Sequence, residues 1–252
     1  MTIYLTGDTH GLDDIGKLQE PAWELRDWRP TADDYLIVVG DVGCVYHTKS
    51  YELPDLDPRD RAVADELTAQ PWTVLFVDGN HDNCDALADM DEEEWHGGLV
   101  HRVDARLIHL TRGQVFDVDG VRVFTMGGAH SPDWMDRVEG ESWWATEMPD
   151  EDERDAARAN LAAAGGAVDV VVTHTCPTEL LGEALDGEQA ARPDEQTDFL
   201  QELYDERLSG FDHWFFGHFH RDLFSIGDGR FTCLQESLVE LDPDTFEPME
   251  TE

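Results

Sequence analysis

The chain has 252 residues and carries 57 acidic against 17 basic side chains, a formal net charge of −40 at pH 7. Such a surface repels polyanions, so sequence-independent binding to long DNA or RNA is not expected. No apolar run approaches the roughly 20 residues that span a bilayer, and the N-terminus shows no basic and apolar leader, which predicts a cytoplasmic protein with no membrane anchor. We interpret the acidic excess as a solvated surface, although an acidic binding face or a high-salt habitat also fits.

Short apolar runs alternate with helical patterns in the first 80 residues, which is typical of an α/β fold with largely parallel strands. Strands are predicted at about residues 2–7, 35–39 and 73–77. An amphipathic helix is predicted at about Leu12–Trp28 and a second at about 58–69, where a proline favours a helix start.

The pattern changes after the third strand. Residues 106–126 alternate like antiparallel strands, and Asp119-Gly120 gives a strong hairpin signal, so a second sheet is expected. A Trp-rich loop at 131–149 precedes an acidic, Ala-rich helix that is predicted to end at Gly165-Gly166. A buried strand, a helix, a strand and a hairpin follow at about 168–172, 194–208, 213–216 and 223–234. With no repeat and no linker, we expect one domain over residues 1–252.

Five of the predicted strands are each followed by a short segment of Gly, Asp, Asn and His residues. These segments are Gly7-Asp8-Thr9-His10-Gly11, Gly40-Asp41-Val42-Gly43, Gly79-Asn80-His81-Asp82, Thr173-His174-Thr175 and Gly217-His218-Phe219-His220. Ligands bind at the carboxyl ends of strands in open α/β sheets, so the five segments are expected to converge on one side of the molecule. Two pairs, Asp8 with His10 and His218 with His220, are two residues apart and can supply adjacent ligands. One such segment alone is more often an ordinary turn, but five in this order favour a shared site.

In order, the segments match D-x-H, G-D, G-N-H-[DE], a lone His and G-H-x-H, and the chain therefore resembles the calcineurin-like metallophosphoesterase family. The resemblance implies an α/β fold, a four-layer αββα sandwich of two mixed sheets flanked by helices. It also implies two metal ions, with Asp41 bridging them. One ion would be held by Asp8, His10 and His220, and the other by Asn80, His174 and His218.

Carboxylate, imidazole and amide ligands together suit Mn, Fe or Zn better than an all-oxygen magnesium or calcium site. Two cations about 3.5–4 Å apart can share a hydroxide that attacks phosphorus in line with the departing oxygen. The resemblance implies that His81 contacts the substrate and protonates the leaving group or stabilises the transition state, and an imidazole pKa of about 6.5 suits this role. An ordinary turn residue is the alternative for His81.

The expected activity is hydrolysis of a phosphomonoester or phosphodiester, with a small molecule or nucleotide as substrate because the acidic surface discourages long polyanions. A catalytically silent, metal-bound scaffold for protein interactions is a second hypothesis. Metal-assisted hydrolysis of an amide or ester is a third, although the H-E-x-x-H element is missing. The sequence does not predict the oligomeric state.

The segment after Asp41 departs from the phosphoprotein phosphatases of this superfamily, which carry an Asp and an Arg shortly after this Gly-Asp. Here Val42-Gly43-Cys44-Val45-Tyr46-His47 follows, so neither an Asp that orients His81 nor an Arg that grips phosphate is identified. His130 ends another predicted strand and either faces the site or is an ordinary loop residue. The 131–149 loop holds Trp134, Trp143 and Trp144, which either form an aromatic lid or pack the loop. The four cysteines form no C-x-x-C pair and are interpreted as reduced packing residues, and His47, His96, His101, His109 and His213 as structural.

Overall fold

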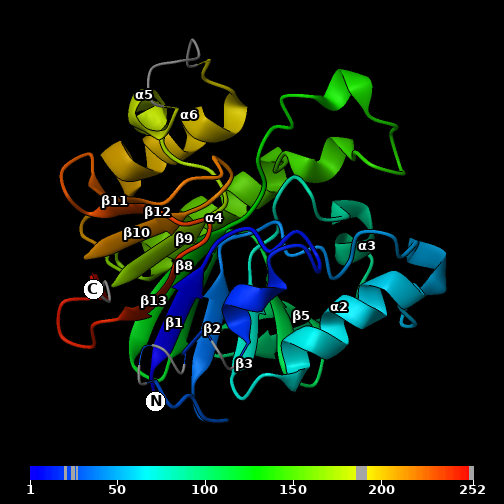
Figure 1. The fold of residues 1–252 in the computed structure, drawn as a ribbon. Coiled ribbons are helices and arrows are strands. Elements are labelled where there is room, and N and C mark those ends of the chain that lie inside the picture. Colours follow the sequence, from blue (N-terminus) through cyan, green and yellow to red (C-terminus); the bar gives the residue numbers. More distant parts are fainter. Residues whose placement is uncertain (20–21, 24–25, 27, 186–191, 250–252) are drawn as a thin grey trace.

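A computed structural model describes residues 1–19, 22–23, 26, 28–185 and 192–249. Two β-sheets are stacked face to face, and helices cover the outer face of each sheet (Figure 1). This confirms the four-layer αββα sandwich.

The first sheet is mixed and has the order β14-β13-β1-β2-β3-β6-β5-β4. Its four central strands, β1, β2, β3 and β6, are parallel to one another, whereas the flanking strands on both sides run antiparallel to their neighbours. The strands are β1 (Ile3–Thr6), β2 (Tyr35–Val38), β3 (Thr73–Phe76), β4 (Glu92–Trp95), β5 (Gly98–Asp104), β6 (Leu107–Leu110), β13 (Leu238–Leu241) and β14 (Pro248–Met249).

The second sheet has the order β11-β12-β10-β9-β8-β7. The four inner strands are parallel, and β7 and β11 form antiparallel edges. The strands are β7 (Gln114–Val118), β8 (Val121–Met126), β9 (Val170–Thr173), β10 (His213–Phe216), β11 (Leu223–Ile226) and β12 (Phe231–Cys233).

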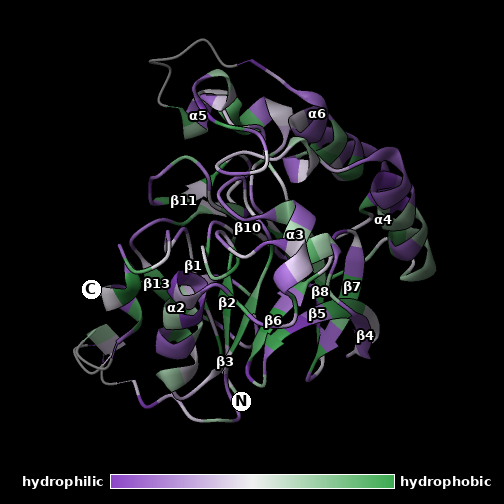
Figure 2. Ribbon diagram, turned by 90° about the vertical axis from the view of Figure 1, so that its right-hand side faces the viewer, coloured by the Kyte–Doolittle hydropathy of each residue, from purple (hydrophilic) through white to green (hydrophobic). Residues whose placement is uncertain are grey.

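Three apolar layers hold the sandwich together. The central layer lies between the sheets and includes Leu5, Ile37 and Phe215, all with an exposed fraction of 1% or less. The neighbouring strand residues, such as Leu36, point to the opposite face and pack under the helices. Both faces of these strands are buried, so they are apolar at nearly every position, as the green centre of Figure 2 shows.

The helices carry both hydrophilic and hydrophobic residues (Figure 2), and their apolar residues pack against a sheet. Helix α2 packs on the first sheet, and α4 and α6 pack on the second. The helices are α2 (Pro58–Ala69), α3 (Cys84–Ala88), α4 (Glu151–Ala163), α5 (Leu181–Ala184) and α6 (Glu195–Glu202), which continues as a π-helical turn, η6 (Leu203–Arg207). Short 3-10 turns are η1 (Ile15–Leu18), η2 (Ser50–Glu52), η3 (Trp134–Asp136), η4 (Ala145–Glu147) and η5 (Thr178–Leu180). Of the helices in the described ranges, none has both the length and the apolarity that crossing a bilayer requires.

Most predicted elements are confirmed, including the helix at 58–69 and the hairpin turn at Asp119-Gly120. The prediction for 106–126 was wrong in one respect, because its first strand, β6, belongs to the first sheet and lies parallel to β3. The helix predicted at 12–28 begins as a single 3-10 turn that ends where Gln19 becomes extended. Within that range, residues 20–21, 24–25 and 27 lie outside the described part of the chain.

Candidate metal centre

All seven proposed ligands lie just beyond the carboxyl ends of β1, β2, β3, β9 and β10. Hydrogen bonds tie the loops together at this edge. The backbone N–H of His10 donates to the carbonyl of Asp41 at 2.8 Å, and the N–H of Gly217 donates to the carbonyl of His174 at 2.9 Å. The first bond joins two strand ends of the first sheet and the second joins two strand ends of the second, so the expected convergence occurs within each sheet.

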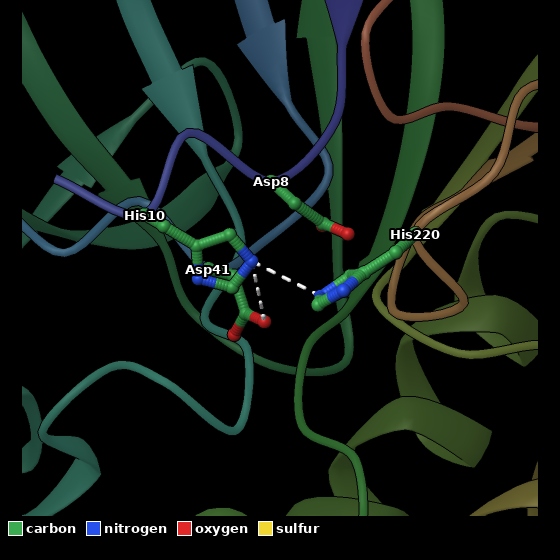
Figure 3. A group of neighbouring side chains, drawn as sticks. All are labelled: Asp8, His10, Asp41 and His220. Atoms are coloured by element: carbon green, nitrogen blue, oxygen red, sulfur yellow. Dashed lines mark hydrogen bonds and ion pairs between the residues drawn. The ribbon is translucent and has the colours of Figure 1, made fainter. Parts of the chain in front are cut away.

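One group of donor atoms comes from Asp8, His10, Asp41 and His220 (Figure 3). One ligand atom from each of these side chains lies within 4.8 Å of the others. The Nε2 atoms of His10 and His220 are 3.1 Å apart, and Nε2 of His10 is 3.9 Å from Oδ2 of Asp41. Two imidazoles and two carboxylates that face one point match the donor set of a transition metal.

A second group consists of Asn80, His174 and His218 together with the other oxygen of Asp41. The Oδ1 atom of Asn80 is 2.9 Å from Nδ1 of His218 and 3.2 Å from Nε2 of His174. Nε2 of His174 is also 3.3 Å from Oδ1 of Asp41. The Nδ1 atom of His174 is 2.8 Å from the carbonyl oxygen of Val39, and a proton on Nδ1 leaves Nε2 free as a ligand.

Asp41 connects the two groups, because Oδ1 faces the second group and Oδ2 faces the first. Its carboxylate has an exposed fraction of 1%, and Oδ1 accepts from the backbone N–H of His81 at 2.7 Å. Oδ2 is buried and has no hydrogen-bond partner among the described residues. A buried carboxylate oxygen without a partner is costly, so this atom fits a bound cation.

Charge in the centre is unbalanced. Burial raises the pKa of Asp8 to about 7, although His174 opposes the shift. Burial also tends to raise the pKa of Asp41, but the imidazole of His174 outweighs it and holds the pKa below its usual range. Burial lowers the pKa of His218 to about 3, so this imidazole is neutral and can act as a ligand. Burial opposes a charge on His174, but the carboxylates of Asp41 and Asp8 outweigh it and raise the pKa of His174 to about 10. The two buried carboxylates thus stabilise positive charge in this centre, as they would stabilise a bound cation.

Five of the seven proposed ligands have a left-handed backbone. A positive φ is uncommon for residues other than glycine and costs on the order of 1 kcal/mol or more, and it persists where the surrounding structure enforces it. The residues are Asp8 (φ 20°), His10 (45°), Asp41 (52°), His218 (71°) and His220 (51°). This clustering of strain is typical of functional sites.

Two glycines let the ligand side chains approach the backbone. A Cβ atom on Gly79 would lie 2.1 Å from Oδ1 of Asp41, and one on Gly40 would lie 2.1 Å from Nδ1 of His174. Gly40 also has a φ of +108°. Both positions therefore require glycine for the observed ligand placement.

The structure shows supporting residues that the sequence analysis did not identify. Asp82 accepts hydrogen bonds from the backbone N–H groups of Gly43 at 2.8 Å and Gly79 at 2.9 Å, so it joins the loops after β2 and β3. Lys17 donates through Nζ to the carbonyls of Gly7 at 2.5 Å and of Gln235. The sequence contained a hint of each residue. Asp82 fills the last position of G-N-H-[DE], and Lys17 is one of only two lysines in the chain.

Another unidentified pair orients Asn80. The Nδ2 group of Asn80 donates to Oγ of Ser131 at 3.1 Å, and Ser131 donates to Glu147 at 2.6 Å. This chain turns Oδ1 of Asn80 toward His174 and His218. The motif blocks do not extend to Ser131 and Glu147. The one available signal was that Ser131 directly follows His130 at the end of a predicted strand, and no pattern pointed to Glu147.

A cavity of about 790 Å³ opens beside the first group of donors. His10, His81 and His220 line it, together with Tyr46 and His47. His81 therefore faces this cavity. Burial lowers the pKa of His81 to about 4, with Asp41 opposing and Arg137 adding to the shift. His47 was expected to be structural, but it contributes to this cavity.

The remaining predicted residues have simpler roles. His130 is half-buried and is not among the described residues that line the cavity. Trp144 is buried with its ring centroid 5.3 Å from that of Tyr46, and Trp134 packs on Trp143 at 5.5 Å. These contacts favour the interpretation that the tryptophans pack the loop. All four cysteines are free and buried, and burial raises their pKa values, as expected for packing residues.

A comparison with known protein families gives a match over most of the chain. The sequence profile of a family described as calcineurin-like phosphoesterase matches residues 1–222. Among curated proteins, no sequence matches the chain significantly.

Several solved structures are similar in fold at low sequence identity. Phosphopantetheinyl hydrolase (PptH) from Mycobacterium tuberculosis is 17% identical, with 96% of each chain covered and a TM-score of 0.47. A 5'-nucleotidase precursor from Thermus thermophilus is 17% identical, with 99% of this chain and 53% of the other covered and a TM-score of 0.42. The sulfate thiohydrolase SoxB from Thermus thermophilus is 14% identical, with 96% and 53% covered and a TM-score of 0.42. The chain thus spans about half the length of the last two proteins.

Proposed function

The chain belongs to the calcineurin-like phosphoesterase family and is a metal-dependent phosphoesterase, and we propose that it uses two metal ions to hydrolyse a phosphomonoester or phosphodiester. Asp8, His10 and His220 would hold one ion, Asn80, His174 and His218 would hold the other, and Asp41 would be a ligand to both. Mn, Fe or Zn suits this donor set.

The position of Asp41 carries the proposal. Its two carboxylate oxygens face two separate groups of donors, and one of them is buried without a partner among the described residues. A residue that only stabilised the fold would pair both oxygens with protein donors. A shared ligand between two cations accounts for the arrangement.

Two bound cations supply Lewis-acid activation of a water molecule and neutralise charge on the phosphate oxygens. The protein residues bind and orient the substrate. Asp41 fixes the backbone of His81 through the 2.7 Å hydrogen bond to its N–H, and this places the imidazole at the mouth of the cavity. His81, neutral at a pKa of about 4, then donates a hydrogen bond to the leaving oxygen from the cavity side. The leaving group itself occupies the cavity beside Tyr46 and His47.

The test is turnover of p-nitrophenyl phosphate and bis(p-nitrophenyl) phosphate with added Mn²⁺, Fe²⁺ or Zn²⁺. Asp41→Asn should abolish metal-dependent turnover, and His81→Ala should lower kcat on the order of 10²- to 10⁴-fold. Asp65→Asn is the matched control, because Asp65 is exposed on α2 at 67% and forms only an i,i+4 ion pair with Arg61.

Three outcomes would overturn the proposal. Metal binding without turnover on either substrate would favour a scaffold, and turnover of carboxylic esters alone would favour the amide or ester hydrolase. Unchanged activity of Asp41→Asn would mean that the reaction does not need Asp41 as a ligand shared by two metal ions.

A further inference from the structure

Arg137 lies against His81, although the two residues are far apart in the sequence. Arg137 follows the η3 turn in the 131–149 loop, the green segment at the upper right of Figure 1. Its Nη2 atom is 3.0 Å from Nε2 of His81, and its Nη1 atom is 3.3 Å from Nδ1. The side chain of Arg137 is 14% exposed, so the guanidinium is largely buried where it meets His81, which itself lines the cavity.

The contact between these two side chains is not fully satisfied. A guanidinium carries only donors, whereas a neutral imidazole has one N–H and one lone pair. Only one of the two close contacts is therefore a hydrogen bond, and the other sets an N–H of Arg137 against an N–H of His81. An anionic oxygen beside the guanidinium would give the N–H groups of Arg137 a charged acceptor in place of this unfavourable contact.

Other contacts hold Arg137 in this position. Nε donates toward Asp133, 2.8 Å from its Oδ1, and Nη1 is 3.2 Å from the carbonyl oxygen of Ser142. The loop is attached to the body of the protein by Lys49, whose Nζ donates to the carbonyl of Gly140 at 2.6 Å. The guanidinium is preorganised, and its Nη2 end still faces His81.

Arg59 lines the cavity directly, but its side chain is engaged elsewhere. Its Nε and Nη2 donate to the two carboxylate oxygens of Asp57 at 2.9 and 3.0 Å. This bidentate ion pair uses the fork that phosphate recognition needs. Arg137 is therefore the better placed of the two arginines to bind a phosphoryl oxygen.

We propose that Arg137, held beside His81, binds one non-bridging oxygen of the substrate, and that Arg137 selects phosphomonoesters over phosphodiesters. The inference rests on the proposed function. A terminal phosphoryl group has three non-bridging oxygens and a charge of about −1.5 to −2 at neutral pH, so one oxygen remains for Arg137 when two face the metal centre. A diester has only two such oxygens, and its second ester oxygen is uncharged and substituted.

Binding is measured by calorimetry on the Mn²⁺-loaded protein, with inorganic phosphate as the monoester analogue and dimethyl phosphate as the diester analogue. Arg137→Ala should weaken phosphate binding roughly ten- to a hundredfold, because a charge-assisted hydrogen bond is lost. Dimethyl phosphate binding should change less than about threefold. Arg137→Lys should recover part of the affinity, since lysine keeps the charge but not the fork.

The matched control is Arg122→Ala, because Arg122 is exposed at 45% and pairs with Asp169 at 3.4 Å at the amino end of β8. This variant should bind both anions like the wild type. Bound manganese and the melting temperature are measured for every variant, so that a lost fold or a lost metal is distinguished from a lost phosphate contact.

Kinetics give the second readout. In Arg137→Ala, kcat/KM should fall at least about tenfold for p-nitrophenyl phosphate and far less for bis(p-nitrophenyl) phosphate. Unchanged phosphate binding, or equal losses for both anions and both esters, would overturn the inference. If the wild type hydrolyses neither ester, the proposed function fails, and calorimetry still decides whether Arg137 selects the phosphate dianion.

Discussion

The side chains of Asn80 and Ser131 are joined by a hydrogen bond of 3.1 Å, although β4 to β8 lie between them in the chain. Ser131 is itself held by Glu147, which accepts from both its hydroxyl and its backbone N–H. The carboxylate of Glu147 thus determines, through Ser131, which atom of the Asn80 amide faces the metal centre.

Ser131→Ala should weaken metal binding on the order of ten- to a hundredfold, because Asn80 loses the partner that fixes its orientation. Glu147→Gln should have a smaller effect, since the amide keeps one acceptor for Ser131. Manganese affinity by calorimetry checks both variants. Wild-type affinity in Ser131→Ala would show that Asn80 needs no support from this loop.

Gly79→Ala should disrupt the centre, because the new Cβ would lie 2.1 Å from Oδ1 of Asp41 and 2.5 Å from its backbone nitrogen. Neither the buried carboxylate nor the backbone can shift freely, so we expect lost metal and a lower melting temperature. Gly182→Ala is the control, as nothing lies within 4 Å of its added Cβ, and its stability should change by about 0.5 kcal/mol or less. Equal behaviour of the two variants would contradict this assignment.

Lys17→Met should destabilise the protein by about 2–3 kcal/mol, because the carbonyls of Gly7 and Gln235 lose a charged donor in a largely buried setting. Urea unfolding gives the free energy. The chain offers one matched lysine: Lys49→Met removes a single exposed hydrogen bond and should cost less than about 1 kcal/mol. A loss for Lys17→Met no larger than for Lys49→Met would mean that Lys17 does not support the turn at Asp8.

We expect the protein to lose stability in acid because His213 is buried. Burial lowers the pKa of His213 to about 4, with a further contribution from Arg230, whereas the unfolded chain titrates near 6.5. The unfolded state therefore binds more protons between these values, and stability that is fully present above pH 6.5 falls as the pH drops toward 4. The loss for this residue is up to about 3 kcal/mol.

Replacement of His213 by Gln should make the dependence of the unfolding free energy on pH shallower between pH 6.5 and 4. It should not remove the dependence, because burial also lowers the pKa of His101, to about 3. Urea unfolding at several pH values is the measurement. An unchanged slope in His213→Gln would mean that the acid sensitivity does not arise from this buried imidazole.

The sequence predicted the fold where local pattern and tertiary environment agree. Helix α2 has its proline at the start and Asp57 as N-cap, and its observed bounds equal the predicted ones. The strand β6 was assigned to the wrong sheet, because alternation shows which faces are buried but not which strand lies alongside. The strand β13 was not predicted, and its pairing with β1 joins the two ends of the chain.

The proposed ligands were found because each lies next to a strand end, a position that the sequence reveals. Ser131, Glu147 and Arg137 were not found, because they reach the centre from a long loop whose path depends on packing. No local pattern distinguishes Arg137 from the other arginines of the chain, and its contact with His81 becomes visible only in three dimensions.

Anomalous scattering from crystals grown with Mn²⁺ would locate the bound ions themselves. We expect two manganese peaks, each next to one oxygen of Asp41, with one peak among Asp8, His10 and His220 and the other among Asn80, His174 and His218. A single peak, or manganese bound away from Asp41, would contradict a centre in which one carboxylate is shared by two ions.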